Sequence, residues 1–235
     1  MVVAAVMAGG IGSRMGADLP KQYLPLAGTP IIVRTTRVLY ASSEVDHVIV
    51  LVPEDWVDYT TQLMSQSGFS STRVTVLCGG TTRNDTLQCA LSFVETHYGL
   101  ADSILLTQDA VRPFLTLDMV SANIAAAREY GCCNTVVPAT DTIIESVDGK
   151  TISAVPDRSV LYQAQTPQTF KADRLQVYMD SLTDLEKETL TDGCKIFLLK
   201  GAPVHLVEGH VTNMKITYPT DMAVAEAILK ETAHE

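Results

Sequence analysis

The sequence predicts an α/β fold in which a mostly parallel β-sheet lies between two layers of helices. Short apolar runs rich in β-branched residues alternate with amphipathic stretches of helical length, a pattern typical of right-handed βαβ crossovers. Runs such as VIVLV and ILLT are apolar nearly throughout, as expected for strands that are covered on both faces. The chain has 235 residues and is 46% hydrophobic, so it can bury a full core.

Strands and helices are expected to alternate along the first 138 residues. The predicted strands are 2–7, 47–52, 73–77, 103–107 and 132–138. Apolar residues recur at spacings of three and four in the predicted helices, which are 31–42, a segment after Pro53, 87–98 and 117–131. In a parallel sheet, ligands bind beyond the carboxyl ends of the strands. The glycine-rich segment after the first strand lies at one such end.

The pattern changes between about residues 141 and 165, where short alternating runs surround a turn at Asp148 and Gly149. These runs predict a hairpin or arm added to the sheet. An ordinary edge hairpin and a dimerisation arm are both open interpretations. Beyond it we expect helices at 171–182 and around 191–201, a strand at 204–209 and a final helix from Pro219. No linker divides the chain, so residues 1–235 are expected to form one domain.

Composition and charge argue against several classes of protein. The formal charge of −10 disfavours binding to nucleic acid, because the phosphates would be repelled. The longest apolar runs fall far short of the roughly 20 residues of a membrane helix, and no secretory leader is expected. The five cysteines form no CxxC pair and no disulfide framework is expected, so the expected location is a reducing cytoplasm.

The stretch MAGGIGSRMGADLPKQYLPLAG, residues 7–28, contains five glycines and follows the first strand. Glycine lets the backbone turn sharply and present its N–H groups, so this loop suits an anion. Arg14 and Lys21 add two cations, which favour a triphosphate as the ligand. A plain strand-to-helix turn is the alternative. The loop matches neither the P-loop nor the dinucleotide fingerprint, whose third glycine would fall at Met15.

Three further segments place polar residues near strand ends. In TQDAVRPF, Asp109 is placed to hold Mg²⁺ between phosphate oxygens, or else it caps a turn and pairs with Arg112. In CGGTTRNDTL, Gly80 permits close approach of a ligand and Thr86 offers a hydroxyl to its base. In NMKITYPTD, Lys215 is expected on a short strand before a helix, where a solvated surface lysine is the alternative.

The chain resembles the cytidylyltransferases that act on sugar-alcohol phosphates, a family that includes members acting on methylerythritol phosphate and on ribitol phosphate. The resemblance covers essentially the whole chain and rests on several motifs in the same order: AGGIGSRMG with PKQYLPLAGTPI, GGTTRNDT, DAVRPF, the DTI segment, RSVLYQAQTPQTF and NMKITYPTD. It implies a Rossmann-like, three-layer nucleotidyltransferase sheet, mostly parallel, with a protruding β-arm.

The resemblance also implies a role for each matching residue. Those that would bind CTP are Ala8, Gly9, Gly10, Gly80, Thr81 and Thr86. The catalytic cations would be Arg14, Lys21 and Lys215. In a homodimer, Thr142 and Arg158 of the arm would reach the acceptor phosphate in the partner's site, with Thr166 close to it. Asp109 would hold Mg²⁺ or another divalent cation, whereas His210 stands where many members carry an acid that helps the metal.

The implied reaction transfers CMP from CTP to the phosphate of the acceptor and releases pyrophosphate. The segment LTDGCKIFLLKG resembles the ribitol-phosphate members, so D-ribitol 5-phosphate is the expected acceptor and CDP-ribitol the expected product. The methylerythritol-phosphate enzyme of isoprenoid biosynthesis is the alternative. A non-catalytic nucleotide sensor on the same fold is an alternative of another class. The expected partners are these small molecules and a second copy of the chain, with no nucleic acid and no membrane.

Overall fold

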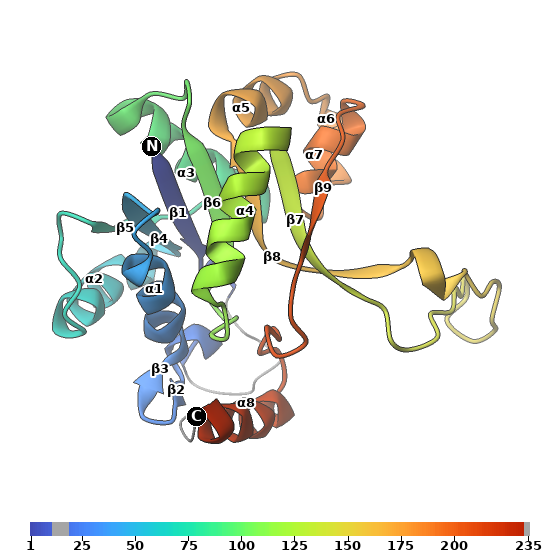
Figure 1. The fold of residues 1–235 in the computed structure, drawn as a ribbon, viewed down its shortest axis with the longest axis horizontal. Helices are drawn as coiled ribbons and strands as arrows, with labels where there is room; N and C mark the ends of the chain where they lie inside the picture. Colours follow the sequence, from blue (N-terminus) through green and yellow to red (C-terminus); the bar gives the residue numbers. More distant parts are fainter. Residues whose placement is uncertain (11–18, 233–235) are drawn as a thin grey trace.

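The computed structural model describes residues 1–10 and 19–232, and a seven-stranded sheet forms its centre (Figure 1). The strands lie in the order β5-β4-β1-β6-β8-β7-β9. Their bounds are β1 Val2–Met7, β4 His47–Val52, β5 Val74–Cys78, β6 Ile104–Asp109, β7 Cys132–Pro138, β8 Tyr162–Lys171 and β9 His205–Glu208. Most neighbours in this sheet pair in parallel, and β8 is its one antiparallel strand within the described residues. A separate two-stranded sheet pairs β2 Pro25–Leu26 with β3 Thr29–Pro30 in antiparallel. The predicted α/β fold with a mostly parallel sheet is confirmed.

Helices cover both faces of this sheet, as Figure 1 shows with α4 in front and α3 behind. Their bounds are α1 Ile31–Ala41, α2 Val57–Gln66, α3 Arg83–Tyr98, α4 Leu117–Tyr130, α5 Ala172–Asp180, α6 Asp184–Glu188, α7 Cys194–Leu199 and α8 Pro219–Thr232. Helix α3 begins four residues before the predicted start at 87, because Thr82 caps it and forms a capping box with Asp85. Each described helix is too short or too polar to cross a bilayer.

The alternation of side chains along β1 explains the two helical layers. Val2, Ala4 and Val6 face the core shared with α1, α2 and α4. The intervening residues, including Val3 and Ala5, face the core shared with α3, α5 and α7. Successive side chains of a strand point to opposite faces, so a strand buried on both sides must be apolar throughout. The continuous run VVAAVM satisfies that requirement.

The central strand β8 is the main difference from the predicted fold. We assigned residues up to 165 to the arm and predicted no strand beyond it, because the sequence YQAQTPQTF is polar and contains a proline. Gln165, Thr166, Gln168 and Thr169 are nonetheless buried, and the main-chain oxygen of Gln168 accepts a hydrogen bond of 3.0 Å from Thr107. Pro167 lies where the β7–β8 register shifts between Asn134 and Val136, so its missing N–H breaks no bond of that ladder.

The arm spans 139–161 and protrudes from the rest of the molecule (Figure 1). Its turn at Asp148 and Gly149 is present: Gly149 has a φ of +68°, and an oxygen of Asp148 accepts bonds of 2.8 Å from the N–H groups of Lys150 and Thr151. The arm is not a regular hairpin, however. Glu145 and Ala154 form an isolated bridge, and most of the remaining backbone is irregular. The arm therefore ends at 161, before β8, and not at 165.

Candidate active site

A cavity of about 400 Å³ opens at the carboxyl ends of β1 and β6, where a ligand is expected in this type of sheet. It is bounded by the end of β1, the turn at 21–23, the glycine loop before α3, the end of β6 and the loop before α8. Its lining residues are Met7, Ala8, Gly9, Gly10, Lys21, Gln22, Gly80, Thr81, Thr82, Arg83, Thr86, Asp109, Ala110, Val111, Lys215 and Thr217.

Asp109 ends β6 and is the carboxylate at the centre of this cavity. Its Oδ1 accepts a bond of 2.8 Å from Arg83, and its Oδ2 lies 3.0 Å from the ammonium of Lys215 and 3.3 Å from Nε of Arg112. The side chain of Asp109 is 7% exposed. Burial by itself would raise the pKa of this carboxyl, but the charges of Arg83, Lys215 and Arg112 outweigh burial and hold the pKa well below its ordinary value. Asp109 is therefore ionised at neutral pH.

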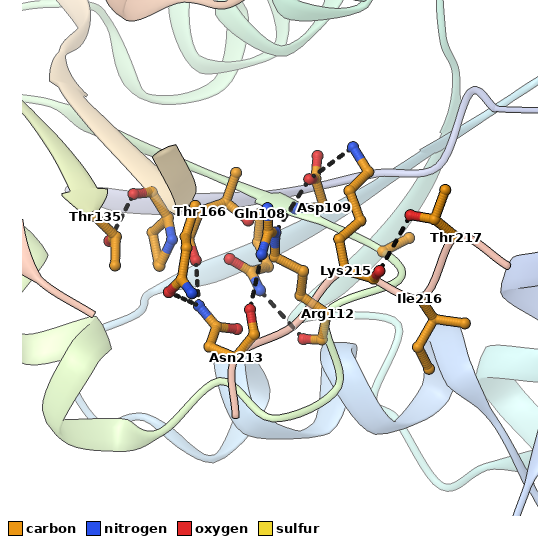
Figure 2. Close-up of polar contacts among 12 residues, drawn as sticks. Gln108, Asp109, Arg112, Thr135, Thr166, Asn213, Lys215, Ile216 and Thr217 are labelled. Carbon is orange, nitrogen blue, oxygen red and sulfur yellow. Dashed lines mark hydrogen bonds and ion pairs between the residues drawn. The ribbon is translucent and has the colours of Figure 1, made fainter. Parts of the chain in front are cut away.

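Lys215 is held against Asp109 by a loop and not by the short strand that we predicted. Residues 211–217 have no regular secondary structure between β9 and α8. The neighbouring Ile216 anchors this loop, since its N–H donates to the oxygen of Val111 at 2.9 Å. Figure 2 shows the side chain of Lys215 extending from the loop to the carboxylate. The side chain of Lys215 is 42% exposed, so its ammonium faces both Asp109 and the open cavity.

Lys21 is buried, although we expected the loop that carries it to be exposed. It opens the 3-10 turn η2, Lys21–Tyr23, and its Nζ donates to the oxygen of Ile216 at 2.9 Å. The turn is fixed in place in part because the ring of Tyr23 stacks on the ring of Trp56, with 4.7 Å between the ring centroids. Gln22 holds it from the side by donating to the oxygen of Ala8 at 2.9 Å. Two loops of the cavity are thus joined through Lys21.

The glycine loop before α3 is shaped by the helix cap. The carboxylate of Asp85 accepts bonds from the Thr82 N–H at 3.0 Å and the Thr81 hydroxyl at 2.8 Å. Thr86, which we expected to bond a ligand base, accepts from the N–H of Gly80 at 3.2 Å and donates to the oxygen of Thr82 at 2.9 Å. A Cβ at Gly80 would lie 2.1 Å from Cβ of Asp85, so only glycine fits this turn.

Most of the predicted site residues lie around one cavity, and a few do not. Those that line it are Ala8, Gly9, Gly10, Lys21, Gly80, Thr81, Thr86, Asp109 and Lys215. Thr166 is buried beside it, and its hydroxyl accepts a bond of 3.1 Å from the N–H of Asp109. Thr142 and Arg158 lie on the protruding arm, where Arg158 donates to the oxygen of Thr140 at 2.8 Å. Arg14 lies outside the described residues.

Two arginines complete the cluster around Asp109. Arg83 was not predicted, although it stands in GGTTRNDT at the first position of a helix that starts beside the cavity. Arg112 was expected only as a pairing partner of Asp109, and that pairing is present; its side chain is also 10% exposed. Three cations, Lys21, Arg83 and Lys215, therefore line the cavity, and Arg112 pairs with its carboxylate, in a chain whose formal charge is −10. Such a local excess of positive charge suits a polyphosphate ligand.

The residues at this site could hold a divalent cation through one carboxylate, that of Asp109. No group of three or more His, Cys, Asp or Glu side chains gathers to hold a metal within residues 1–10 and 19–232. Asp109 thus offers a single carboxylate, which suits Mg²⁺ when phosphate oxygens and water supply the other ligands. His210 is not among the residues that line this cavity, and its Nδ1 lies 2.7 Å from the hydroxyl of Thr212 and accepts from the Thr212 N–H at 3.2 Å.

Comparison with known proteins gives consistent matches along almost the whole chain. A family model described as IspD, 2-C-methyl-D-erythritol 4-phosphate cytidylyltransferase, matches residues 2–231. A structure of 4-diphosphocytidyl-2C-methyl-D-erythritol synthase is 27% identical, with 97% of this chain and 98% of that chain covered and a TM-score of 0.78. The 2-C-methyl-D-erythritol 4-phosphate cytidylyltransferase from Thermus thermophilus is 25% identical, with coverages of 98% and 100% and a TM-score of 0.73. The synthase from Anaerococcus prevotii DSM 20548 is 24% identical, with coverages of 97% and 96% and a TM-score of 0.80, and supports the fold.

Proposed function

This chain belongs to the IspD family of CTP-dependent cytidylyltransferases, and we propose that it transfers CMP from CTP to the phosphate of a sugar alcohol, releasing pyrophosphate. The observation that carries this proposal is the cluster of Lys21, Arg83 and Lys215 around Asp109 at the edge of one cavity. A phosphate monoester is already an anion near neutral pH, so the attacking oxygen needs no strong general base. The reaction instead needs two anions held together against their mutual repulsion.

The proposed roles follow from where each side chain lies. Lys21 and Lys215 neutralise charge that develops on the α-phosphate and on the leaving pyrophosphate, and Arg14 is expected to assist them. The backbone at Ala8, Gly9 and Gly10, together with Gly80, Thr81 and Thr86, surrounds the nucleotide. Because these groups stand on short loops fixed to strand ends, they need little reorganisation when the charge moves. In-line attack on the α-phosphorus then breaks its bond to the pyrophosphate oxygen.

We propose Mg²⁺, or another divalent cation, as the cofactor, held by Asp109 together with the CTP phosphates. The ion would supply additional neutralisation of phosphate charge when bound. Arg83 and Lys215 are partly exposed, so either can leave the carboxylate for a phosphate oxygen when the nucleotide arrives. Arg112 stays in place, because it is buried and also donates to the oxygen of Asn213 at 2.7 Å.

The acceptor that the comparisons support better is 2-C-methyl-D-erythritol 4-phosphate, since the family model and the Thermus thermophilus structure carry that name. The 27% identical structure is named as a synthase of 4-diphosphocytidyl-2C-methyl-D-erythritol. On this basis the chain would serve isoprenoid biosynthesis. D-Ribitol 5-phosphate, the acceptor that we first expected, gains no support from these comparisons. It remains a second candidate on one observation, the segment LTDGCKIFLLKG, whose Asp192–Gly193 pair precedes α7.

We propose a homodimer in which the arm completes the partner's acceptor site through Thr142 and Arg158. The arm carries a row of exposed apolar side chains, which a second copy would cover: Ile144, Val147, Ile152, Val155 and Val160. Val147 is the most exposed of these five residues, at 95%. The five free cysteines fit the reducing cytoplasm that we propose as the location.

Pyrophosphate release from CTP tests the proposal. The purified protein should release pyrophosphate only when CTP, Mg²⁺ and an acceptor are all present, and the acceptor panel should contain both candidate phosphates. A sensor that binds CTP without turnover would release none with any acceptor. Lys215→Ala provides the site control, because it should bring the rate close to background if the activity belongs to this cavity.

A further inference from the structure

The loop that carries Lys215 lacks regular secondary structure, yet it must hold an ammonium 3.0 Å from Asp109. One anchor lies after the lysine, where Ile216 bonds Val111 and accepts from Lys21. The other anchor lies two residues before it, at Asn213. Figure 2 shows Asn213 between the strand that carries Thr166 and the side chain of Arg112.

The side chain of Asn213 is fully buried, and its amide nitrogen makes two bonds. Nδ2 donates to Oε1 of Gln165 at 3.1 Å and to the main-chain oxygen of Thr166 at 2.8 Å. Gln165 in turn donates from its own amide to the oxygen of His210 at 2.9 Å. We call the Asn213 and Gln165 side chains the amide brace. The brace closes the loop from 210 to 213 onto β8.

The brace also reaches Asp109 by two routes. The main-chain oxygen of Asn213 accepts the 2.7 Å bond from Arg112, whose Nε lies 3.3 Å from the carboxylate. Thr166, whose oxygen the brace holds, accepts from the N–H of Asp109 at 3.1 Å. Asn213 therefore links the loop that carries Lys215 to Arg112 and Thr166, two of the residues that bond Asp109.

Two features show that this corner is constrained by more than packing. Oδ1 of Asn213 is buried and finds no hydrogen-bond partner among residues 1–10 and 19–232, a cost that a stable core normally avoids. Gly209 lies against the brace so closely that a Cβ there would be 2.5 Å from Oε1 of Gln165. The donors of Asn213 are thus retained at a cost in stability, as expected where a polar group serves the site.

We propose that Asn213 is a positioning residue for the transfer reaction, acting through the amide brace to hold Lys215 and Arg112 at Asp109. This inference rests on the proposed function. Asn213 itself touches no substrate in this proposal. Its effect comes from the placement of the Lys215 ammonium, and misplacing a reacting-site group by about 1 Å can cost on the order of a hundredfold in rate.

The test compares Asn213→Ala with Asn123→Ala. Asn123 is also fully buried, and its amide bonds Met119 of α4 and Thr135 of β7, so its loss provides a matched structural control. At equal fractions folded, we expect Asn213→Ala to lower kcat and kcat/KM together by roughly a hundredfold and Asn123→Ala to leave both nearly unchanged.

Equal activity of Asn213→Ala and Asn123→Ala would overturn the inference. If Asn213→Ala does not fold, Gln165→Leu removes the acceptor of the brace at the rim of the core and should lower kcat about tenfold. A wild-type protein without turnover refutes the proposed function instead. Hydrogen exchange then tests whether the brace holds the loop. The backbone amides of 209–217 should exchange faster in Asn213→Ala than in wild type, and at the wild-type rate in Asn123→Ala. Equal exchange rates in the two variants would overturn the inference.

Discussion

Replacing Asp109 with asparagine probes the charge balance of the cavity, because the substitution keeps the shape of the side chain and removes the charge that three cations share. Arg112 accounts for most of the expected loss in the free energy of unfolding, because its side chain is only 10% exposed. Leaving such a buried arginine without its partner costs about 3–5 kcal/mol. The side chains of Arg83 and Lys215 are 32% and 42% exposed, and water screens these pairs to about 1 kcal/mol or less each. We expect a loss of about 4 kcal/mol in the free energy of unfolding at pH 7.

Urea unfolding as a function of pH measures this loss and its sign. The folded protein holds the pKa of Asp109 below its ordinary value of 3.8, so the stabilisation is complete above that value and disappears as the pH falls below it. The difference between wild type and Asp109→Asn should therefore be largest at neutral pH and should shrink below about pH 4. Asp118→Asn, in the exposed first turn of α4, should cost only a few tenths of a kcal/mol. A loss below about 1 kcal/mol at pH 7, or one that is independent of pH, would refute this reasoning.

Three further outcomes are expected. Lys21→Ala should lower kcat/KM about a hundredfold in steady-state kinetics and also lower stability, and a loss under threefold contradicts the role. Lys21→Met keeps the buried stem and loses the bond to Ile216, so it should lose as much activity and less stability. Gly80→Ala should lower Tm by several degrees, because its Cβ would overlap Asp85, whereas Gly10→Ala, whose Cβ would meet no atom of the described part of the chain within 4 Å, should not change Tm. Mixing inactive Lys21→Ala and Arg158→Ala subunits should restore about a quarter of the activity if the arm completes the partner's site, and no recovery would argue that it does not.

The strands buried on both faces were the most predictable part of this molecule. The bounds of β1 and β4 agree with the prediction because continuous apolar runs have few other uses in a chain of this size. Those of β7 agree as well, although Asn134 and Thr135 interrupt its apolar run. β8 was missed for the opposite reason: residues 165–170 are buried inside the sheet, but Gln165 and Thr166 bond partners that are distant in sequence, at His210 and Asp109. Hydropathy cannot distinguish such a strand from a loop.

Only part of the candidate site, likewise, could be predicted from the sequence. Its loops carry glycine-rich motifs that are readable along the chain, so the residues lining the cavity near Gly9, Gly80 and Asp109 were predicted from short segments. The contributions of Arg83 and Asn213 depend on partners far away, at Asp109 in the first case and at Gln165 in the second. Such pairs exist only after the fold brings strand ends together, and no local pattern marks them.

The measurement that tests the central claim most directly is pyrophosphate release from CTP and Mg²⁺ with 2-C-methyl-D-erythritol 4-phosphate and, separately, with D-ribitol 5-phosphate. CMP transfer predicts release that requires one of these acceptors, the matching CDP-alcohol as the second product, and loss of both products in Lys215→Ala. Turnover with methylerythritol phosphate supports the acceptor favoured by the comparisons, and turnover with ribitol phosphate alone would replace it. CTP binding without pyrophosphate release from either acceptor would contradict CMP transfer itself.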